Sequence, residues 1–337
     1  MPQMVALLNG FGGGASVRAA EIDKAGLIDG IAVSEPNVTP RFDGRFTIVQ
    51  AGRAPVRKHS RPLLDYTSRV HVFQACANLA PENAAAPLNL AGSPARCARL
   101  AELGLIAGAS LEEQARAAQR AINTAGILRE QNLVQPSHWF INVPQAIAVT
   151  YANAYGRFGV QDRLCGYGFG AAAPGTGAPV QLAAAALDVI FATSNGIPPT
   201  GGVALINERA PGGPKEDRLS TPDQNLDGAL CIRSLVGKPP PQGVGGPGRG
   251  AVLRGIGEVE ASGDLGGRPA IFVTGRSDAI LPPNHTSRAY YGRNRLVEGR
   301  RSGLRYYEVT NAQHLDALNG LDGFRQRYVP LHVYFLQ

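Results

Sequence analysis

Long apolar runs are missing from this chain of 337 residues, although 44% of its residues are hydrophobic. No stretch is long enough to cross a bilayer, so we expect no membrane span. The N-terminus also lacks a basic segment followed by an apolar one, so no secretory signal is visible. If the mature protein is exported, we expect the segment that directs export to lie outside this chain.

Lysine is scarce, because it occurs only at positions 24, 58, 215 and 238 among 33 basic side chains. The formal net charge of +7 raises the question of a nucleic-acid partner. The arginines are scattered, and we find neither a basic helix stripe nor a basic segment interleaved with aromatic residues. We therefore expect an ordinary basic surface and no nucleic-acid partner.

Cysteine pairs of the C-x-x-C type are absent, which argues against a zinc site. The four cysteines are Cys76, Cys97, Cys165 and Cys231. If a disulfide forms, we expect Cys76 to pair with Cys97, because they would close a short loop rich in Ala, Pro and Asn. In a reducing compartment all four would instead be small core residues, and the sequence leaves both alternatives open.

A nucleophile is missing from the turn near the start of the chain. The apolar run 5–8 meets a glycine cluster at Gly10 and 12–14, and a small-residue segment of helical character follows. This pattern predicts a strand, a tight turn and a helix start, the arrangement that presents the nucleophile in many hydrolases. No Ser or Cys precedes Ser16, however, which lies several residues past the turn.

Both ends of the chain carry the pattern of a parallel sheet. Near the start, the pattern predicts a helix over 16–25 and a buried strand within 26–34. Near the end, it predicts strands at 268–275 and 304–310, separated by a helix over 284–297. We therefore predict an α/β fold with a parallel sheet, interrupted by one large insertion.

The insertion, residues 40–267, is predicted to be mainly helical, so that the sheet is built from 1–39 and 268–337. Ser110 and Glu113 form a capping box at the start of a helix that reaches Ala125. Two further helices are predicted over 144–155 and 179–192, because each has proline near its first turn. The Gly-rich and Pro-rich stretches 170–177 and 237–250 are predicted to be loops.

Two residues with acid–base chemistry follow the last two predicted strands. Asp278 lies three residues past one strand, and His314 lies four residues past the next. The carboxyl ends of parallel strands meet at one edge of a sheet, so both side chains are predicted to lie there. An Asp at that edge can fix the tautomer of the His, which can then act as a general base toward a hydroxyl. The order acid-then-histidine is that of α/β-hydrolases.

Each of these residues also has a structural interpretation. An Asp after a strand is often a turn residue, and a His near a C-terminal helix is often structural. Their order on consecutive strand ends favours catalysis. The competitors are His285, which we expect to pack or cap at the start of a helix, and Asp316, which we expect to be a local turn residue.

Several stretches resemble the D-(−)-3-hydroxybutyrate oligomer hydrolases, a family of α/β-hydrolase esterases. The resemblance covers nearly the whole chain. It is clearest at Leu164-Cys-Gly-Tyr-Gly-Phe, Asn195-Gly-Ile-Pro-Pro-Thr, Gly275-Arg-Ser-Asp-Ala-Ile-Leu-Pro and Asn311-Ala-Gln-His-Leu-Asp-Ala. The resemblance implies a small-molecule ester substrate, short oligomers of 3-hydroxybutyrate, and no metal or organic cofactor. It also implies that the insertion is a lid.

The same resemblance assigns roles to four residues. Asp278 and His314 match the acid and the base of a catalytic triad. The family has a serine in the nucleophile elbow, where this chain has Gly10, and Phe11 then takes the place of the residue whose amide lines the oxyanion hole. The first strands of the sheet are expected to be missing, so a Gly10→Ser change alone is expected to restore little activity.

Two explanations remain for the absent serine. The chain is either a truncated or mis-started form of an esterase, or a degenerate copy. In the second case the protein would be a non-catalytic remnant that binds hydroxyalkanoate oligomers or a protein partner. The intact Asp278 and His314 favour the enzyme, whereas Gly10 favours the remnant.

Overall fold

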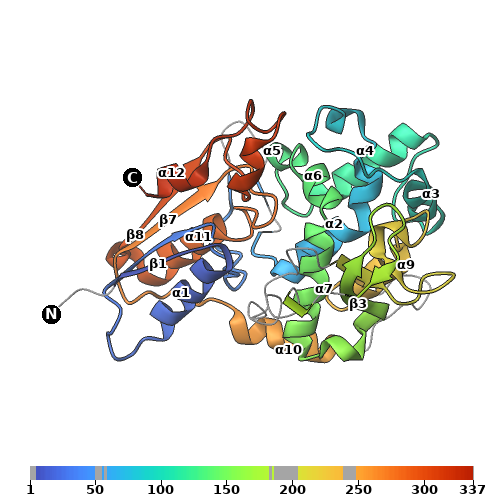
Figure 1. Ribbon diagram of the computed structural model, residues 1–337. Coiled ribbons are helices and arrows are strands. Elements are labelled where there is room, and N and C mark those ends of the chain that lie inside the picture. The colour runs from blue at the N-terminus through green and yellow to red at the C-terminus, as the bar shows by residue number, and fades with distance from the viewer. Residues whose placement is uncertain are drawn as a thin grey trace. The chain divides into compact units, whose positions relative to one another are not determined.

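The computed structural model describes residues 5–49, 55–56, 59–181, 184–185, 204–237 and 248–336. The chain divides into two compact units (Figure 1). Unit 1 comprises Met1–Leu63, Asn123–Gln135 and Val259–Gln337, and unit 2 comprises Leu64–Ile122 and Pro136–Glu258. None of the described helices is both long and apolar enough to cross a membrane.

Unit 1 is built on a parallel sheet of four strands. The strands are β1 (Val5–Asn9), β2 (Gly30–Ser34), β7 (Ala270–Gly275) and β8 (Leu304–Val309), and they lie side by side in that order. The register places Leu8 opposite Val33, Val33 opposite Phe272, and Phe272 opposite Tyr306. The predicted parallel sheet, with strands from both ends of the chain, is therefore confirmed.

Helices cover both faces of this sheet (Figure 1). Helices α1 (Gly10–Ile22) and α11 (Ser287–Glu298) share one apolar core with the sheet, in which Val17 and Tyr290 pack near Val33 and Phe272. On the other face, Leu331 of α12 (Leu331–Phe335) packs with Val273 and Ala312. The alternation of strand side chains between two faces thus gives each face its own helical cover. The short helices α5 (Arg129–Asn132), η5 (Gly299–Arg301) and η6 (Asp316–Gly320) also belong to unit 1.

Helix α1 begins at Gly10, six residues before the start that the sequence predicted. Glycines are poor helix formers, so the sequence pattern placed the start after the glycine cluster. One of these glycines is needed for close packing, because a Cβ on Gly14 would lie 2.0 Å from the carbonyl oxygen of Asn37. The Asn37 amide also donates to the carbonyl oxygen of Gly10 at 2.9 Å, which ties the helix start to the loop after β2.

Unit 2 contains most of the helices of the described chain. They are α2 (Leu63–Ala77), α3 (Pro94–Glu102), α4 (Leu111–Asn123), α6 (Gln135–Phe140), α7 (Val143–Gly156), α9 (Leu226–Ser234) and α10 (Arg249–Val259), with short 3-10 turns η1 (Pro81–Asn83), η2 (Val160–Asp162), η3 (Leu164–Gly166) and η4 (Asp217–Leu219). The predicted capping box starts α4, because the Glu113 amide donates to Ser110 Oγ at 3.2 Å and the Ser110 amide donates to Glu113 Oε2 at 3.3 Å.

Unit 2 also contains an antiparallel sheet that the sequence analysis did not predict. Its strands are β3 (Tyr167–Ala172), β4 (Pro179–Val180), β5 (Ala204–Asn207) and β6 (Lys215–Glu216), in the order β4-β3-β5-β6. Residues 170–172 were predicted to be loop, and Pro179 was predicted to start a helix. Strand β3 pairs with β5, which is distant in the sequence. This pairing places in a sheet segments whose amino-acid composition favours turns. Most of 179–192, and residues 238–247 of the predicted second loop, lie outside the described residues.

Two disulfides lie within unit 2. Cys76 pairs with Cys97, as expected from their spacing, and Cys165 pairs with Cys231. Cys76 and Cys97 are fully buried, and Cys165 and Cys231 belong to an apolar cluster of unit 2 that includes Leu164. The disulfide alternative is therefore the one that the structure supports.

Candidate functional site

The segments that follow the four strands of unit 1 meet at the carboxyl ends of those strands. Gly10 follows β1, Glu35 follows β2, Asp278 follows β7, and His314 follows β8. The four strands are parallel and adjacent, so these segments share one edge of the sheet. We call Gly10, Glu35, Asp278 and His314 the rim residues.

Asp278 is a fully buried carboxylate with a complete set of donors. The amides of Ile280 and Leu281 both donate to its Oδ1 at 2.8 Å, and His314 Nδ1 lies 2.9 Å from its Oδ2. The local turn thus fixes the Asp278 carboxyl group with its Oδ2 directed at the imidazole ring.

The loops after β7 and β8 are pressed together, which fixes this pair. The Ser277 amide donates to the carbonyl oxygen of Ala312 at 2.9 Å. Gly275 allows that approach, because a Cβ there would lie 2.6 Å from the same carbonyl oxygen. Asn311, with a φ of 57°, turns the chain out of β8 toward His314. The hydrogen bond between Asp278 and His314 therefore rests on backbone contacts that surround it.

His314 is largely enclosed, with 11% of its side chain exposed. Burial lowers the pKa of this imidazole, but the nearby carboxylates Asp278 and Glu35 outweigh burial and raise the pKa to about 9. With Nδ1–H donated to Asp278, the proton-accepting nitrogen of the neutral ring is Nε2. A pair of this kind can remove a proton from a hydroxyl group that approaches Nε2.

A glycine faces the Nε2 side of the His314 ring. Gly10 has a φ of +50°, and a Cβ built on it would lie 3.7 Å from both Nε2 and Cε1 of His314. A left-handed residue between a strand and a helix is the geometry of a nucleophile elbow. Phe11 follows as the second residue of α1, where the backbone N–H has no acceptor within the helix.

Glu35 is the rim residue that the sequence analysis missed. Its side chain is 3% exposed, and its Oε2 lies 3.5 Å from His314 Nδ1. Burial raises the pKa of Glu35 well above its usual value, His314 opposes that rise, and Asp278 adds to it. A charged residue directly after the apolar segment Gly30–Ser34 was the available signal, because that strand end lies on the same edge as Asp278.

The remaining candidates from the sequence make local or packing contacts. Ser16 is buried in α1, and its hydroxyl donates to the carbonyl oxygen of Gly12 at 3.2 Å. His285 is buried before α11, where its Nδ1 accepts the Arg61 amide at 3.3 Å. Asp316 accepts the amides of Leu331 and His332 at 2.9 and 3.0 Å, so it anchors α12.

Glu35, Asp278 and His314 are also the described residues best placed to hold a cation. Their ligand atoms all lie within 4.8 Å of one another. However, the Nδ1 and Oδ2 atoms that would bind a metal are already at hydrogen-bonding distance from each other, so this hydrogen bond would compete with a cation.

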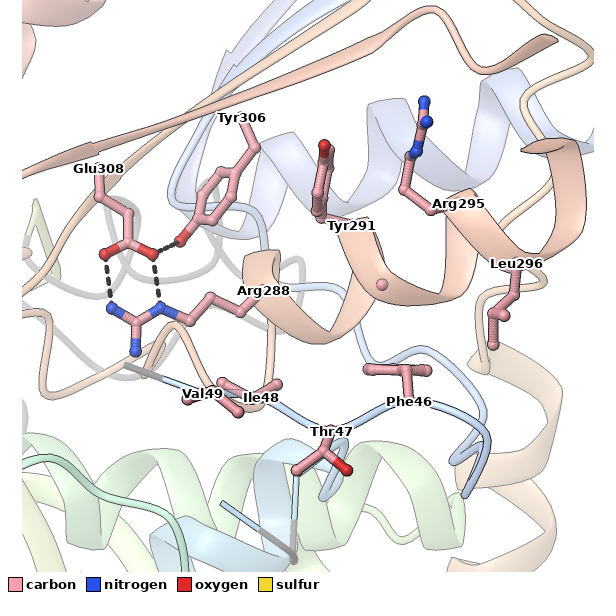
Figure 2. Close-up of a pocket in the computed structure, with 11 residues that line it drawn as sticks. Phe46, Thr47, Ile48, Val49, Arg288, Tyr291, Arg295, Leu296, Tyr306 and Glu308 are labelled. Carbon is pink, nitrogen blue, oxygen red and sulfur yellow. Dashed lines mark hydrogen bonds and ion pairs between the residues drawn. The ribbon is translucent and has the colours of Figure 1, made fainter. Parts of the chain in front are cut away.

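A cavity of about 430 Å³ lies in unit 1 between α11, β8 and residues 46–49 (Figure 2). Figure 2 shows Glu308 facing Arg288, which donates to it at 2.5 Å, and Tyr306, whose hydroxyl donates at 2.8 Å. Glu308 also accepts Arg276 Nε at 3.1 Å, two residues before Asp278. The rim residues do not line this cavity. Its wall contacts the Asp278 loop through the hydrogen bond between Glu308 and Arg276.

Comparison with known proteins gives a consistent result. The family model described as "3HB-oligomer hydrolase (3HBOH)" matches residues 4–337. Proteins named D-(-)-3-hydroxybutyrate oligomer hydrolase are 45% identical in Paracidovorax citrulli, 44% in Cupriavidus metallidurans and 40% in Burkholderia cenocepacia, over 96%, 96% and 97% of this chain. The matches cover 47%, 45% and 46% of those relatives, so the chain spans about half their length. No solved structure matches it.

Proposed function

Because this chain belongs to the 3HB-oligomer hydrolase family, we propose that its rim residues are the acid–base part of a site that hydrolyses the ester bonds of 3-hydroxybutyrate oligomers. His314 is the base and Asp278 is the acid that orients it. Gly10 occupies the position of the nucleophile. The observation that carries this proposal is the position of Gly10, whose Cβ site faces His314 Nε2 at 3.7 Å.

The proposed fold of unit 1 is that of an α/β-hydrolase. The strands that lead to the elbow, to Asp278 and to His314 are parallel members of one sheet, and the acid precedes the histidine in the chain. That order and placement are those of the α/β-hydrolase triad. The lid role of the insertion remains a prediction from the resemblance.

The proposed reaction is acyl transfer through a serine ester. A hydroxyl at position 10 would attack the ester carbonyl carbon while its proton passes to His314 Nε2. Asp278 stabilises the imidazolium, and the Phe11 amide at the start of α1 donates to the oxyanion. His314 then gives the proton to the departing alkoxide, and water releases the acyl group by the reverse sequence of steps. Gly10 supplies no hydroxyl, so we propose that the chain with Gly10 does not form the acyl ester.

The test is to place the missing hydroxyl. Gly10→Ser should react covalently with a fluorophosphonate probe, because phosphonylation needs only a nucleophile and its base and reports the pair even where ester turnover stays low. The unmodified chain should not be labelled. Intact-protein mass spectrometry measures the adduct, and peptide mapping should place it at residue 10.

Two further variants decide the assignment. His314→Ala in the Gly10→Ser chain should remove the labelling, whereas Ser16→Ala in the same chain should leave it unchanged. An adduct on Ser16, or labelling that is independent of His314, would contradict the proposal. Hydrolysis of the 3-hydroxybutyrate dimer by the unmodified chain would contradict it as well.

A second candidate function follows from Gly10 itself. Without a nucleophile, the same site would bind hydroxyalkanoate oligomers and leave them intact. Calorimetry with the 3-hydroxybutyrate trimer should then show binding to the unmodified chain, together with full recovery of intact trimer. Absence of binding at millimolar trimer would remove this alternative.

A further inference from the structure

Glu35 occupies an unfavourable place for a carboxyl group. Its backbone has a φ of 45°, a left-handed conformation that side chains other than Gly, Asn and Asp seldom adopt. The Glu35 amide donates to the carbonyl oxygen of Val273 at 2.9 Å, which extends the pairing of β2 with β7 and fixes this conformation. Strain of this kind at the rim of a candidate site indicates a functional constraint.

The Glu35 side chain is also incompletely satisfied. Its Oε1 is buried without a hydrogen-bond partner, and its Oε2 has His314 Nδ1 at 3.5 Å, beyond a good hydrogen bond. Asp278, by contrast, has N–H donors at 2.8, 2.8 and 2.9 Å. The carboxyl groups of Glu35 and Asp278 therefore flank His314 Nδ1, but the N–H donors are all directed to Asp278.

We propose that Glu35 is a second acid for His314, a positioning residue whose carboxyl group can accept the Nδ1–H when the charge of Asp278 is removed. The inference rests on the proposed function, because it concerns the same base. It names a role for Glu35 that neither the family match nor the triad pattern includes.

The charges around the ring support this role. Among the described residues, the charged groups that act on His314 are Asp278, Glu35 and Asp316. Burial raises the pKa of Glu35, His314 opposes that rise, and Asp278 adds to it. Removing the Asp278 charge therefore lowers the pKa of Glu35 and favours a charged carboxyl group there. The second carboxyl group beside Nδ1 can then replace the first.

The experiment measures the titration of the His314 ring by NMR in the protein with Gly10 intact, so it does not depend on turnover. Glu35→Gln should lower the midpoint, but by less than Asp278→Asn does, because Asp278 still accepts the Nδ1–H. Asp278→Asn should lower the midpoint moderately. The Glu35→Gln, Asp278→Asn double variant should lower the midpoint by about one pH unit more than the sum of the two single changes, because no anion remains beside Nδ1.

Two controls separate a carboxyl role from a packing role. Glu35→Asp in the Asp278→Asn protein keeps the charge but moves it away from Nδ1, so its midpoint should lie between those of the Asp278→Asn protein and the double variant. Asp322→Asn removes an exposed carboxylate elsewhere in unit 1 and should leave the midpoint unchanged. Additive shifts in the double variant, or a double variant equal to Asp278→Asn alone, would overturn the inference.

Labelling of the Gly10→Ser chain keeps the two proposals distinguishable. Labelling that does not depend on His314 would contradict the proposed function, irrespective of the result for the Glu35 variants. If His314 is required, Asp278→Asn should retain partial labelling, and Glu35→Gln added to it should reduce the rate at least another tenfold. Retained labelling in that last variant would defeat the role of Glu35 alone.

Discussion

Each unit contains an enclosed histidine beside an aspartate, and the pKa values of the two imidazole rings are shifted in opposite directions. In unit 1, His314 Nδ1 lies 2.9 Å from Asp278, and its pKa is raised to about 9 by carboxylates that outweigh burial. In unit 2, His71 Nε2 lies 3.6 Å from Asp217. Burial lowers the pKa of His71, Asp217 opposes that effect, and Arg96 adds to it.

The difference comes from the other partners of each ring. Asp217 accepts Asn225 Nδ2 at 2.7 Å, and the Tyr167 hydroxyl lies 3.3 Å from His71 Nε2. All of these groups are buried, and Arg96 beside them is fully buried. At the rim, by contrast, the free side of His314 faces Gly10. A histidine–aspartate pair is therefore a candidate for catalysis only where one ring nitrogen faces a position that substrate or nucleophile can occupy.

The largest expected effect separates the two histidines by chemistry. In the Gly10→Ser chain, His314→Ala should lower the rate of fluorophosphonate labelling by about a hundredfold or more, because the general base is removed. His71→Phe should leave the rate per folded molecule unchanged. Stopped labelling time courses, corrected for folded protein by circular dichroism, measure both. A large loss in the His71 variant would break the comparison.

The next effect tests whether the cluster around His71 is structural. Arg96 donates to the carbonyl oxygens of His71 and Val72 at 3.0 Å and also to those of Asp223 and Gln224. Arg96→Met should lower the free energy of unfolding by about 3–5 kcal/mol, because several buried carbonyl groups lose their donor. Urea unfolding of the oxidised protein measures it.

Arg116→Met is the matched control for this change. Arg116 is exposed and pairs with Glu82 and Glu112 at the surface. Its loss should cost no more than about 0.5 kcal/mol. Equal effects at the two positions would show that the buried cluster does not hold unit 2 together.

The sequence predicted the rim pair and not the buried pair for a physical reason. Asp278 and His314 each follow a strand with a clear apolar pattern, and parallel strands bring their carboxyl ends to one edge. His71 lies inside helix α2 and reaches Asp217 only through the tertiary fold. No local pattern encodes that contact.

Other parts of the fold also divide into features that a local sequence pattern predicts and features that depend on tertiary contacts. Cys76 and Cys97 are 21 residues apart, and the capping box at Ser110 is local, so both were predictable. The antiparallel sheet was not, because β3 has the sequence Tyr-Gly-Phe-Gly-Ala-Ala and becomes a strand through pairing with distant residues. Glu35 was missed because a single charge before proline also fits a turn.

A smaller effect uses the pH dependence of stability, where the two histidines differ in sign. The pKa of His314 is raised in the folded state, so its stabilising contribution is present below about pH 6.5 and is lost as pH rises through about 9. The pKa of His71 is lowered, so its contribution is lost as pH falls below about 6.5.

Variants at the two positions should therefore reduce the pH dependence of the free energy of unfolding on opposite limbs of the curve, the alkaline limb for His314 and the acid limb for His71. His314→Ala should reduce the alkaline decline, by at most about 3 kcal/mol, and His71→Phe should reduce the acid decline. Urea midpoints at pH 5, 7 and 9.5, converted to free energies, measure both limbs. A loss of the acid limb in the His314 variant would reverse the assignment of the two environments.

The smallest effect concerns the cost of placing Glu35 at the rim. Its φ of 45° is unfavourable for a residue with a Cβ, and its Oε1 is buried without a partner. Glu35→Ala removes the carboxyl group and keeps the backbone strain, whereas Glu35→Gly removes both. Glycine adopts this conformation without the Cβ clash, so the Gly variant should be more stable than the Ala variant by about 1 kcal/mol. Urea unfolding at pH 7 compares the two chains, and equal stabilities would show that the φ at this position carries no strain. If the expected order holds, unit 1 retains at its rim a residue that lowers its own stability, which is the behaviour expected of a group kept for chemistry.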